Sequence, residues 1–567
     1  MAFWWLGLMG AAVASPNVEA IHGLERASDC ESFGARLDAS IAQIASDRIA
    51  SLVPQRWMES LEPLSVDASE GIPQTHSVAL AQEEGLAEAD RLATDGLHLY
   101  ALAGGALQIA SVAGGPLASV PLVGAPQGLF LDGDRVIVLT EAPSSWRTPV
   151  DTRVSVFDVS TPSEPQLVRE VVASGRLRGA SVDGERLVFV TSQPLQRRPL
   201  AGEAKVAVGE SPERWLPMAT EARYVAGEQR PKVSVHSGTC AGVVYDPEQL
   251  VEQVSGVHAL DLGDVASTLQ TAVVLGGADI VYIGHERVWL GRADPLDAYL
   301  TELDGFQLAG GPRWDVSGAV TGRLTGRLAL SERDGVLRVA LASTAGGADV
   351  LTVRSVDGAL EALGALHVGH ARDELKAARY DGDRLWLVTF LRADPLYDVD
   401  LSDPAAPALR GELEIPGWSD LLVPIAGDRL LAAGVDGSGS GTSLSLFDVA
   451  DPARPTRADV LALGGVDSTA RDGLDAWTWS PEEDLLALTT TGLRRQVKVI
   501  RVRAGDLEPL GPVDLPRALG LPVDTAFVGE TLWIATERGL YAAAGAELGA
   551  QRQWAWADAG DGVSDAR

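Results

Sequence analysis

The stretch RADPLYDVDLSDPAAP, residues 392–407, places Asp394, Asp398, Asp400 and Asp403 within ten positions. Carboxylates at this spacing can bind a hard cation, carry out acid–base chemistry or accept backbone N–H bonds in turns. Asp400 recurs at the same position of a repeated segment, so we expect it in a structural turn, and Asp403 belongs to the same Asp-Pro turn. The repeat explains neither Asp394 nor Asp398.

A second set of charged residues lies in otherwise apolar segments and forms the candidate functional site. Charges in apolar strands need ion-pair partners or contact with a water-filled channel. One interpretation is a set of ion pairs between neighbouring repeats. The other is a polar patch at a channel mouth, where acidic groups would bind Ca²⁺. The set comprises Glu88, Asp90, Glu332, Arg338, Glu374, Arg379 and Asp394.

Histidines supply one weaker candidate for a transition-metal site. HVGHARDE (367–374) offers His367, His370, Asp373 and Glu374 as ligands, and the alternative is a solvated loop. The sequence contains no H-E-x-x-H, G-x-x-x-x-G-K-[ST] or G-x-S-x-G motif. None of these catalytic signatures therefore assigns a reaction.

Net charge narrows the choice of partners. The 567 residues include 78 acidic and 46 basic ones, which leaves a formal charge of −32. Such a surface repels phosphate backbones and anionic lipids, so nucleic acid and membrane surfaces are poor partner candidates.

Two short elements repeat along the chain and predict the architecture. The first is a turn followed by an apolar strand, as in DGDRVIVLT (132–140), DGERLVFVT (183–191), DGDRLWLVT (381–389) and GDRLLAAG (427–434). The second contains Asp158, Asp261, Asp400 or Asp448, as in VFDVSTPSEP (156–165) and LFDVADPARP (446–455). The repeat length of about 45–51 residues is typical of a propeller blade. We expect an all-β propeller of eight or nine four-stranded antiparallel blades over residues 75–545.

The remaining segments flank or interrupt this propeller. MAFWWLGLMGAAVA (1–14) has an apolar run too short to span a bilayer and a small-x-small box, which predicts a signal peptide. An uncleaved hydrophobic start is the alternative. Residues 15–74 are expected to hold a short amphipathic helix (31–50) and a linker. We expect an insertion at about 192–256, a flexible tail at 546–567, and a strand from QTHSVALAQ (74–82) that completes the last blade.

The two cysteines are Cys30 and Cys240. In an exported chain such a pair predicts one disulfide between the N-terminal segment and the insertion. If the chain is not exported, two separate buried thiols are the better interpretation.

Three long stretches resemble one family. EEGLAEADRLATDG (83–96), LALSERDGVLRVA (328–340) and DELKAARYDGDRLWLVTFLRADPLYDVDLSDP (373–404) are similar to segments of bacterial and archaeal secreted proteins. These proteins have a C-terminal β-propeller distantly related to WD-type repeats. The resemblance runs from Cys30 to about residue 490 and implies export and a propeller, but no particular reaction.

This chain departs from the family pattern at several positions. Val423 stands where relatives have His, and Leu474 and Asp475 replace a His-Lys pair. Any metal or reaction that those histidines serve in relatives is therefore not expected here. Asp398 stands where an aliphatic residue is usual.

Together these features predict an exported binding or scaffolding protein. We expect a monomer in the cell envelope or outside the cell, with another envelope or extracellular protein as partner and Ca²⁺ as the one candidate ion. The alternative function is a propeller hydrolase in which a cation at the channel mouth activates water.

Overall fold

The computed structural model describes most of the residues from 75 to 556. The described ranges are 18–19, 25–35, 37, 75–77, 80–143, 150–194, 216–224, 232–237, 240, 242–246, 253–264, 266–294, 297–390, 394–415, 417–435, 441–463, 474–489, 495–544 and 548–556. The predicted signal peptide and most of the linker lie outside these ranges. Of the predicted helix at 31–50, residues 31–35 and 37 are described, and they are helical.

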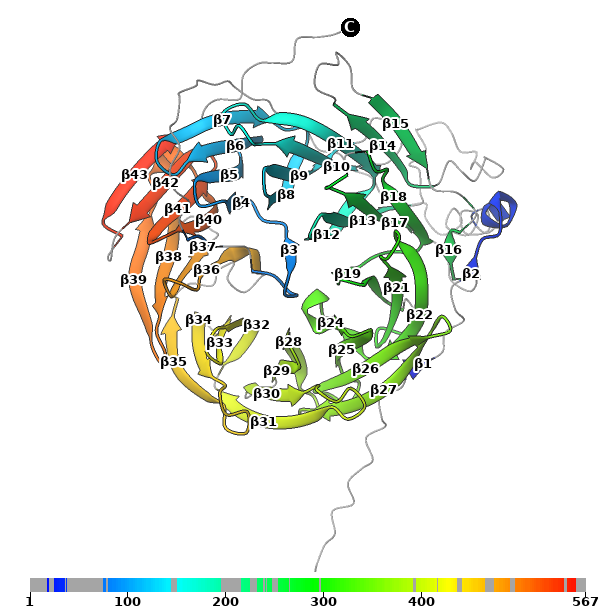
Figure 1. The fold of residues 1–567 in the computed structure, drawn as a ribbon. Coiled ribbons are helices and arrows are strands. Elements are labelled where there is room, and N and C mark those ends of the chain that lie inside the picture. The colour runs from blue at the N-terminus through cyan, green and yellow to red at the C-terminus, as the bar shows by residue number, and fades with distance from the viewer. Residues whose placement is uncertain are drawn as a thin grey trace, which may run out of the picture.

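The described strands form a closed ring of antiparallel sheets around a central channel (Figure 1). They make eight hydrogen-bonded sheets, one of which contains two blades joined by a single parallel bridge between Ser317 and Ala359. The ring therefore has nine blades within the described residues, which confirms the all-β propeller. Each blade runs from an inner strand at the channel to an outer strand at the rim.

The first three blades follow one another along the chain. Blade 1 consists of β4 (Leu92–Thr94), β5 (His98–Ala103), β6 (Ala106–Ser111) and β7 (Gly115–Pro121). Blade 2 consists of β8 (Ala125–Asp132), β9 (Arg135–Ala142), β10 (Asp151–Asp158) and β11 (Gln166–Ser174). Blade 3 consists of β12 (Arg176–Asp183), β13 (Arg186–Pro194), β17 (Gln253–Asp261) and β18 (Gln270–Leu275).

Blades 4 and 5 share the ten-stranded sheet. Blade 4 consists of β19 (Ile280–Ile283), β20 (Arg287–Ala293), β21 (Leu300–Gln307) and β22 (Arg313–Thr321). Blade 5 has an interrupted inner strand, β23 (Arg323–Leu324), the 3-10 turn η2 (Arg327–Ala329) and β24 (Leu330–Arg333), followed by β25 (Val336–Ala342), β26 (Ala348–Val356) and β27 (Ala359–Val368). Blade 6 consists of β28 (Glu374–Asp381), β29 (Arg384–Phe390), β30 (Asp394–Asp400) and β31 (Ala408–Ile415).

The last three blades return to the first. Blade 7 consists of β32 (Trp418–Ile425), β33 (Arg429–Val435), β34 (Thr442–Asp448) and β35 (Thr456–Ala462). Blade 8 has the turn η4 (Leu474–Ala476), then β36 (Trp477–Ser480), β37 (Leu485–Thr489), β38 (Gln496–Val502) and β39 (Leu507–Asp514). The turn η5 (Arg517–Leu519) leads to blade 9, which consists of β40 (Pro522–Val528), β41 (Thr531–Thr536), β42 (Gly539–Ala544) and β43 (Ala550–Ala555).

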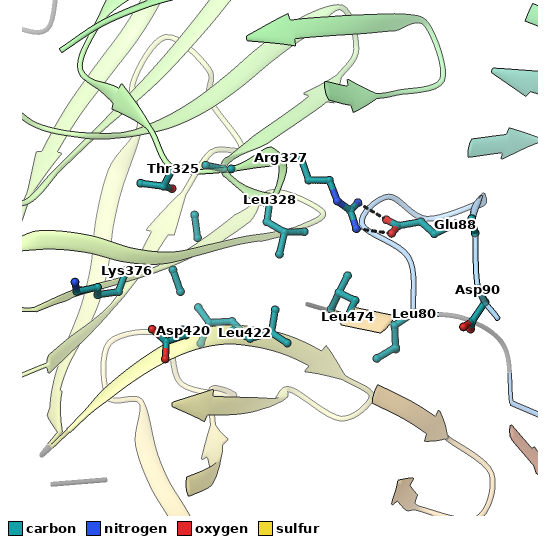
Figure 2. A pocket seen from close by; sticks show the side chains of 16 residues that line it. Leu80, Glu88, Asp90, Thr325, Arg327, Leu328, Lys376, Asp420, Leu422 and Leu474 are labelled. Atoms are coloured by element: carbon teal, nitrogen blue, oxygen red, sulfur yellow. Dashed lines mark hydrogen bonds and ion pairs between the residues drawn. The ribbon is translucent and has the colours of Figure 1, made fainter. Parts of the chain in front are cut away.

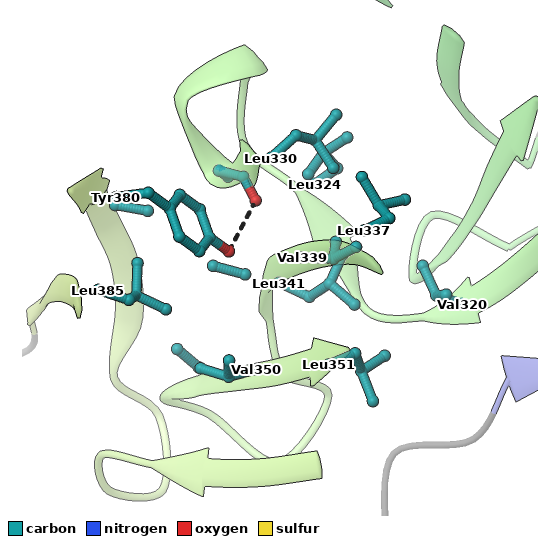
Figure 3. Packing of buried hydrophobic residues seen from close by; sticks show 14 of the residues in the cluster. Val320, Leu324, Leu330, Leu337, Val339, Leu341, Val350, Leu351, Tyr380 and Leu385 are labelled. Atoms are coloured by element: carbon teal, nitrogen blue, oxygen red, sulfur yellow. Dashed lines mark hydrogen bonds between the residues drawn. The ribbon is translucent and has the colours of Figure 1, made fainter. Parts of the chain in front are cut away.

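The hydrophobic core lies between neighbouring blades. One cluster joins Val320 of blade 4, Leu337 and Val339 of blade 5, and Leu385 of blade 6, all fully or almost fully buried (Figure 3). Tyr380 packs into the same cluster, and its hydroxyl group donates a hydrogen bond of 3.4 Å to the Ala329 carbonyl. Since the middle strands of each blade are apolar on both faces, every blade packs on two neighbours and the ring forms one body.

The repeated Asp is a turn residue at all four positions. The Asp400 carboxylate accepts the backbone N–H of Ser402 at 2.8 Å, two residues further along the chain. Asp158 accepts from Ser160 at 2.9 Å. The equivalent bonds at the other two positions are Ala450 N–H to Asp448 at 3.0 Å and Asp264 N–H to Asp261 at 2.9 Å. The structural interpretation of Asp400 agrees with this geometry.

The Arg of the D-G-x-R element links each of these blades to the next. It follows a tight turn whose Gly has a positive φ, 54° at Gly133 and 55° at Gly184 and Gly382, which matches a two-residue hairpin turn. Arg384 of blade 6 donates to the Val449 carbonyl of blade 7 at 2.8 Å. Equivalent bonds run from Arg135 to Leu262 and from Arg429 to Val502, whereas Arg186 donates to the His285 carbonyl in the turn between β19 and β20 of blade 4. The repeat therefore encodes contacts between blades as well as the turn itself.

Blade 9 corrects two expectations. Its outer strand is β43, so residues 550–555 of the expected tail form a strand, and residues 557–567 lie outside the described residues. The described residues of segment 74–82 supply no outer strand, because β43 takes that place and His76 forms a bridge with Val528 of the inner strand β40. The sequence AQRQWA of β43 is polar, as suits a half-exposed outer strand, and it therefore carries no strong strand signal.

The N-terminal segment and the insertion lie at the rim of blades 2 to 4 (Figure 1). β14 (Met218–Arg223) and β15 (Lys232–Ser237) extend blade 2 to six strands, while β2 (Glu25–Arg26) pairs with β16 (Val244–Tyr245) beside blade 3. β1 (Val18–Glu19) pairs with β22. The predicted disulfide between Cys30 and Cys240 is present, with 4.8 Å between the Cα atoms, and it joins these two segments.

Candidate functional site

Residues 80–91, called here the channel segment, cross the centre of the ring (Figure 1). The Ala81 carbonyl accepts a bond of 2.7 Å from Arg379 of blade 6. Gln82 donates to the carbonyls of Arg327 and Leu330 in blade 5, at 2.6 and 2.8 Å. Glu83 accepts a bond of 2.9 Å from the hydroxyl group of Tyr282 in blade 4.

The second half of the channel segment lies against blades 3, 2 and 9. Its strand β3 (Leu86–Glu88) pairs with the inner strand β12. Asp90 and Leu129 of β8 exchange two backbone hydrogen bonds, of 3.0 and 2.7 Å. At Gly128 a Cβ atom would come within 2.7 Å of the Ala89 side chain, so the close approach of the segment requires a glycine there.

This crossing has a physical reason. More blades leave a wider central channel, and a ring of nine exceeds the usual range of about four to eight. Inner strands facing a wide channel would lack packing partners on that side. The channel segment fills this space with the protein's own chain.

The channel segment divides the channel into two cavities. The larger half-channel has a volume of ≈ 500 Å³ and is lined by blades 5 to 8, with contributions from Thr325, Lys376, Asp420 and Leu474. The smaller half-channel has a volume of ≈ 280 Å³ and is lined mainly by blades 2 to 4. Glu88, Ala89 and Arg327 line both.

An ion pair forms the partition between the two half-channels. The Arg327 guanidinium donates to both oxygens of Glu88, at 2.7 and 2.6 Å, and also to Gln82 at 3.1 Å. The Arg327 side chain is 42% exposed and that of Glu88 18%. This bidentate geometry is the strongest form of an Arg–carboxylate contact, although its exposure weakens it.

The larger half-channel has an apolar middle and charged ends. Figure 2 shows Leu328, Leu422 and Leu474 between the two ends, together with Leu80 of the channel segment. Lys376 and Asp420 lie at one end, and Asp90 and the Glu88–Arg327 pair lie at the other. A pocket of this size is typical of sites for small ligands.

Two carboxyl groups meet at the Asp90 end. The side chain of Asp524, on the inner strand β40, is hydrogen-bonded to that of Asp90 and is almost fully buried. The backbone N–H of Arg91 donates to both carboxyl groups, at 2.8 Å to Asp90 and 3.2 Å to Asp524. Burial and the neighbouring charge of Asp90 raise the pKa of Asp524 well above its ordinary value, so its carboxyl group ionises less readily than an exposed one.

The remaining charged candidates do not gather in one patch. Glu332 pairs with Arg287 of blade 4 at 2.7 Å, and burial raises the pKa of this carboxyl group while Arg287 opposes the shift. Arg338 donates to the Gly382 carbonyl of blade 6 at 2.6 Å. Glu374 pairs with Lys376 of its own strand at 2.8 Å. Glu332 and Arg338 therefore form contacts between blades.

Two of the sequence-predicted residues need separate mention. Arg379 contacts the channel segment through one nitrogen, while its Nε and Nη1 atoms are buried with no hydrogen-bond partner in the described structure. Burial lowers the pKa of its guanidinium, and the carboxylates of Glu88 and Glu83 oppose that shift. Asp394 lies in β30, but its side chain is outside the described residues.

The histidine motif forms no metal site in the described part of the chain. His367 contacts Asp349 at 2.7 Å, and the carboxylate of Asp373 accepts the backbone N–H of His370 at 2.9 Å. Among the described residues, no three His, Cys, Asp or Glu side chains form a group that could hold a metal ion. The Ca²⁺ patch expected at the channel mouth therefore has no ligand set in that part of the molecule.

The residues that depart from the family pattern are buried where the structure describes their side chains. Val423 and Leu474 are buried in one hydrophobic cluster, and Leu474 also lines the larger half-channel. The side chain of Asp475 lies outside the described residues. Asp398 is 1% exposed, and one of its carboxylate oxygens is paired with Arg384, while Oδ1 is buried with no hydrogen-bond partner in the described structure.

Sequence reasoning missed several residues of the half-channels. Arg327, Lys376, Asp420 and Asp524 line the larger cavity or stand behind its wall. Asp524 sits in the apolar stretch VDTAFV, so the rule that selected the other buried charges would have found it. For Arg327, Lys376 and Asp420 the sequence alone carries no such signal.

In the described part of the chain, no helix has both the length and the apolar character needed to span a bilayer. The strands and short 3-10 turns of the ring account for nearly all of its regular structure.

The solved structures that match this chain do so at low sequence identity. A protein from Lactobacillus plantarum is 14% identical, with a TM-score of 0.34, and the match covers 56% of this chain and 94% of that one. A eukaryotic initiation factor is 12% identical, with a TM-score of 0.37, over 78% of this chain and 90% of that one.

Curated relatives come from archaea. An uncharacterized protein of Methanocaldococcus jannaschii is 33% identical over 191 residues, which is 33% of this chain and 29% of the relative. An uncharacterized protein of Archaeoglobus fulgidus is 38% identical over 137 residues, 24% of this chain and 21% of the relative. The matched part thus spans less than a third of each relative's length. The family model of the beta propeller domain matches residues 76–508, and with the ring described above this places the chain in the beta propeller domain family.

Proposed function

We propose that this chain is an exported binding protein that holds a small ligand in the larger half-channel. The observation that carries the proposal is the cavity of ≈ 500 Å³ with an apolar middle and charged ends. Ligand sites in proteins are typically clefts of about 300–1,000 Å³ in which mostly apolar walls supply affinity and a few polar groups orient the ligand.

Export is supported by the disulfide and by the N-terminal sequence. The Cys30–Cys240 bond joins segments 210 residues apart, and bonds of this kind persist in oxidising compartments. The expected signal peptide at residues 1–14 agrees with that location. The site of action would then be the cell envelope or the space outside the cell.

A scaffolding role is the second candidate, and one feature favours it. The hairpin β14–β15 widens the rim of blade 2, and at the two ends of β14 Met218 and Tyr224 are 49% and 37% exposed. Exposed apolar side chains on an added hairpin suit contact with another envelope or extracellular protein. A pull-down from envelope extract with the intact chain and a Met218→Ser/Tyr224→Ser variant tests this role, which predicts a captured protein that the variant loses.

Probe binding tests the ligand-binding proposal. The probe is N-phenyl-1-naphthylamine, a neutral apolar fluorophore, titrated into the purified full chain. Thr325→Trp places a bulky group at the larger half-channel, and Gln127→Trp is the matched control at the smaller one, because both wild-type residues are exposed lining residues. Saturable binding should be lost in Thr325→Trp and kept in Gln127→Trp. Equal binding by both variants would overturn the proposal.

A further inference from the structure

The charged groups that line the larger half-channel are not balanced. Its acidic residues are Glu88, Asp90 and Asp420, and its basic residues are Arg327 and Lys376. The wall therefore carries an excess of one negative charge. In a cavity walled by protein, a charge excess favours a ligand of opposite charge more strongly than it would in bulk water.

Both basic groups already hold anionic partners. Arg327 is bound through two hydrogen bonds to Glu88, at 2.7 and 2.6 Å. Lys376 donates to Glu374 at 2.8 Å, and its ammonium group lies 6.0 Å from the centre of the Phe390 ring. An anionic ligand would have to displace a carboxylate of the protein from either group.

The Asp90 end has a different arrangement. The carboxyl group of Asp524 is hydrogen-bonded to that of Asp90, and burial and the charge of Asp90 raise the pKa of Asp524. Two backbone N–H groups donate to this pair, that of Arg91 and, at 2.7 Å, that of Thr525. The Arg91 guanidinium donates to the Pro126 carbonyl at 3.4 Å. Asp90 is the member of the pair that lines the cavity.

Leucine side chains adjoin this charged end. Leu80 and Leu474 lie beside Asp90, and Leu328 and Leu422 continue the apolar surface away from it (Figure 2). An occupant that places a charged group at Asp90 would therefore lay its remaining atoms against leucine.

From the charge excess, the acid pair and the leucine surface, we infer that the larger half-channel takes an apolar molecule with a single ammonium group, and that Asp90 holds the ammonium. This inference rests on the proposed function and names its ligand class. The ammonium donates to the Asp90 carboxylate, while Asp524 and the Arg91 N–H hold that carboxylate in place. The apolar body packs on the leucines.

Competition with a head-group series tests the inference on the wild-type chain. At pH 7 and low salt, n-octylammonium, n-octanol and octanoate each compete with bound N-phenyl-1-naphthylamine. They share one apolar body and differ in charge. We expect octylammonium to compete at about tenfold lower concentration than octanol, because a charge-assisted hydrogen bond contributes at least that factor, and octanoate to compete least.

Variants locate the ammonium. Asp90→Asn should remove the advantage of octylammonium over octanol and leave octanol unchanged. Asp524→Asn is the control, because the amide still donates to Asp90 and leaves its charge in place, so octylammonium should keep its advantage. A trileucine amide with a free amino terminus then separates a peptide ligand from an alkylamine, according to which displaces the probe at lower concentration.

The outcomes separate the inference from the proposed function. If the probe binds in the larger half-channel but octanoate competes best, or all three compete equally, the ammonium inference is wrong and the binding function stands. If octylammonium keeps its advantage in a folded Asp90→Asn variant, Asp90 is not the acceptor. If the probe does not bind the larger half-channel at all, the proposed function itself fails.

Discussion

The junctions between blades and the channel are built in opposite ways. At the blade junctions one Asp and one Arg recur: the Asp accepts a backbone N–H two or three residues further on, and the Arg donates to a carbonyl of the next blade. In the channel, the segment 80–91 occurs once, and its residues contact blades 6, 5, 4, 3, 2 and 9 through partners that no repeat relates. Repetition marks the groups that hold the blades together, and the candidate site lies where repetition stops.

The same contrast separates the charged residues by burial. Asp398 and Arg384 at the blade 6–blade 7 junction have side chains 1% and 17% exposed. Glu88 and Arg327 in the channel have side chains 18% and 42% exposed. Removing one partner of a buried pair leaves an uncompensated charge, whereas an exposed pair contributes little to stability. Substitutions at the blade junctions should therefore affect stability most, and substitutions in the channel should affect ligand binding most.

The largest effect on stability is expected for Arg384→Leu at the junction of blades 6 and 7. This change removes the partner of buried Asp398 and the bond to the Val449 carbonyl, so it should lower the free energy of unfolding by about 3–5 kcal/mol. Denaturant unfolding measures the loss. The double variant Arg384→Leu/Asp398→Leu should recover a substantial part of it, and a double variant as unstable as the single one would contradict the role given to the pair.

A smaller effect is expected for the turn. Asp400→Ala removes the bond to the Ser402 N–H and should cost about 1 kcal/mol. Probe affinity in the larger half-channel should be unchanged, since Asp400 does not line that cavity. A variant that unfolds like the wild type but loses probe affinity would contradict the assignment of stability to the blade junctions and of binding to the channel.

The same carboxylate gives a pH dependence. Hydrogen bonding by Arg410 lowers the pKa of Asp400 to about 2, below the unfolded value of about 3.9. A lowered pKa contributes stability above the unfolded value, and this contribution is lost as the pH falls from about 4 to about 2. Unfolding curves across this range should show a smaller decline for Asp400→Asn than for the wild type. Equal declines would contradict the assignment.

The smallest stability effect is expected in the channel. Glu88→Gln removes the ion pair with half-exposed Arg327 and should change the free energy of unfolding by less than about 1 kcal/mol. Probe binding should change, because the partition between the two half-channels loses its anchoring contact. A thermal melt and a probe titration on one preparation measure both. A large loss of stability without a change in binding would make the channel segment a structural plug.

Features within one repeat were predictable from the sequence. The blade length, the Gly turns, the turn role of Asp400 and the propeller itself follow from local hydrogen bonding and from periodicity, and both are visible in a single chain. The Cys30–Cys240 bond was predictable because the chain offers a single pair. The seven charged candidates were selected on sound grounds, since buried charges need partners, but their partners could not be named.

Tertiary structure alone decided the channel. Gln82 meets Arg327 across 245 residues of sequence, and Arg91 meets Asp524 across 433. No period relates such positions, because they come together only when the ring closes. Likewise, the polar strand β43 is recognisable as the outer edge of blade 9 only beside β42. Local hydrogen bonding and the sequence period determined the blades. Closure of the ring decided which residues face the larger half-channel.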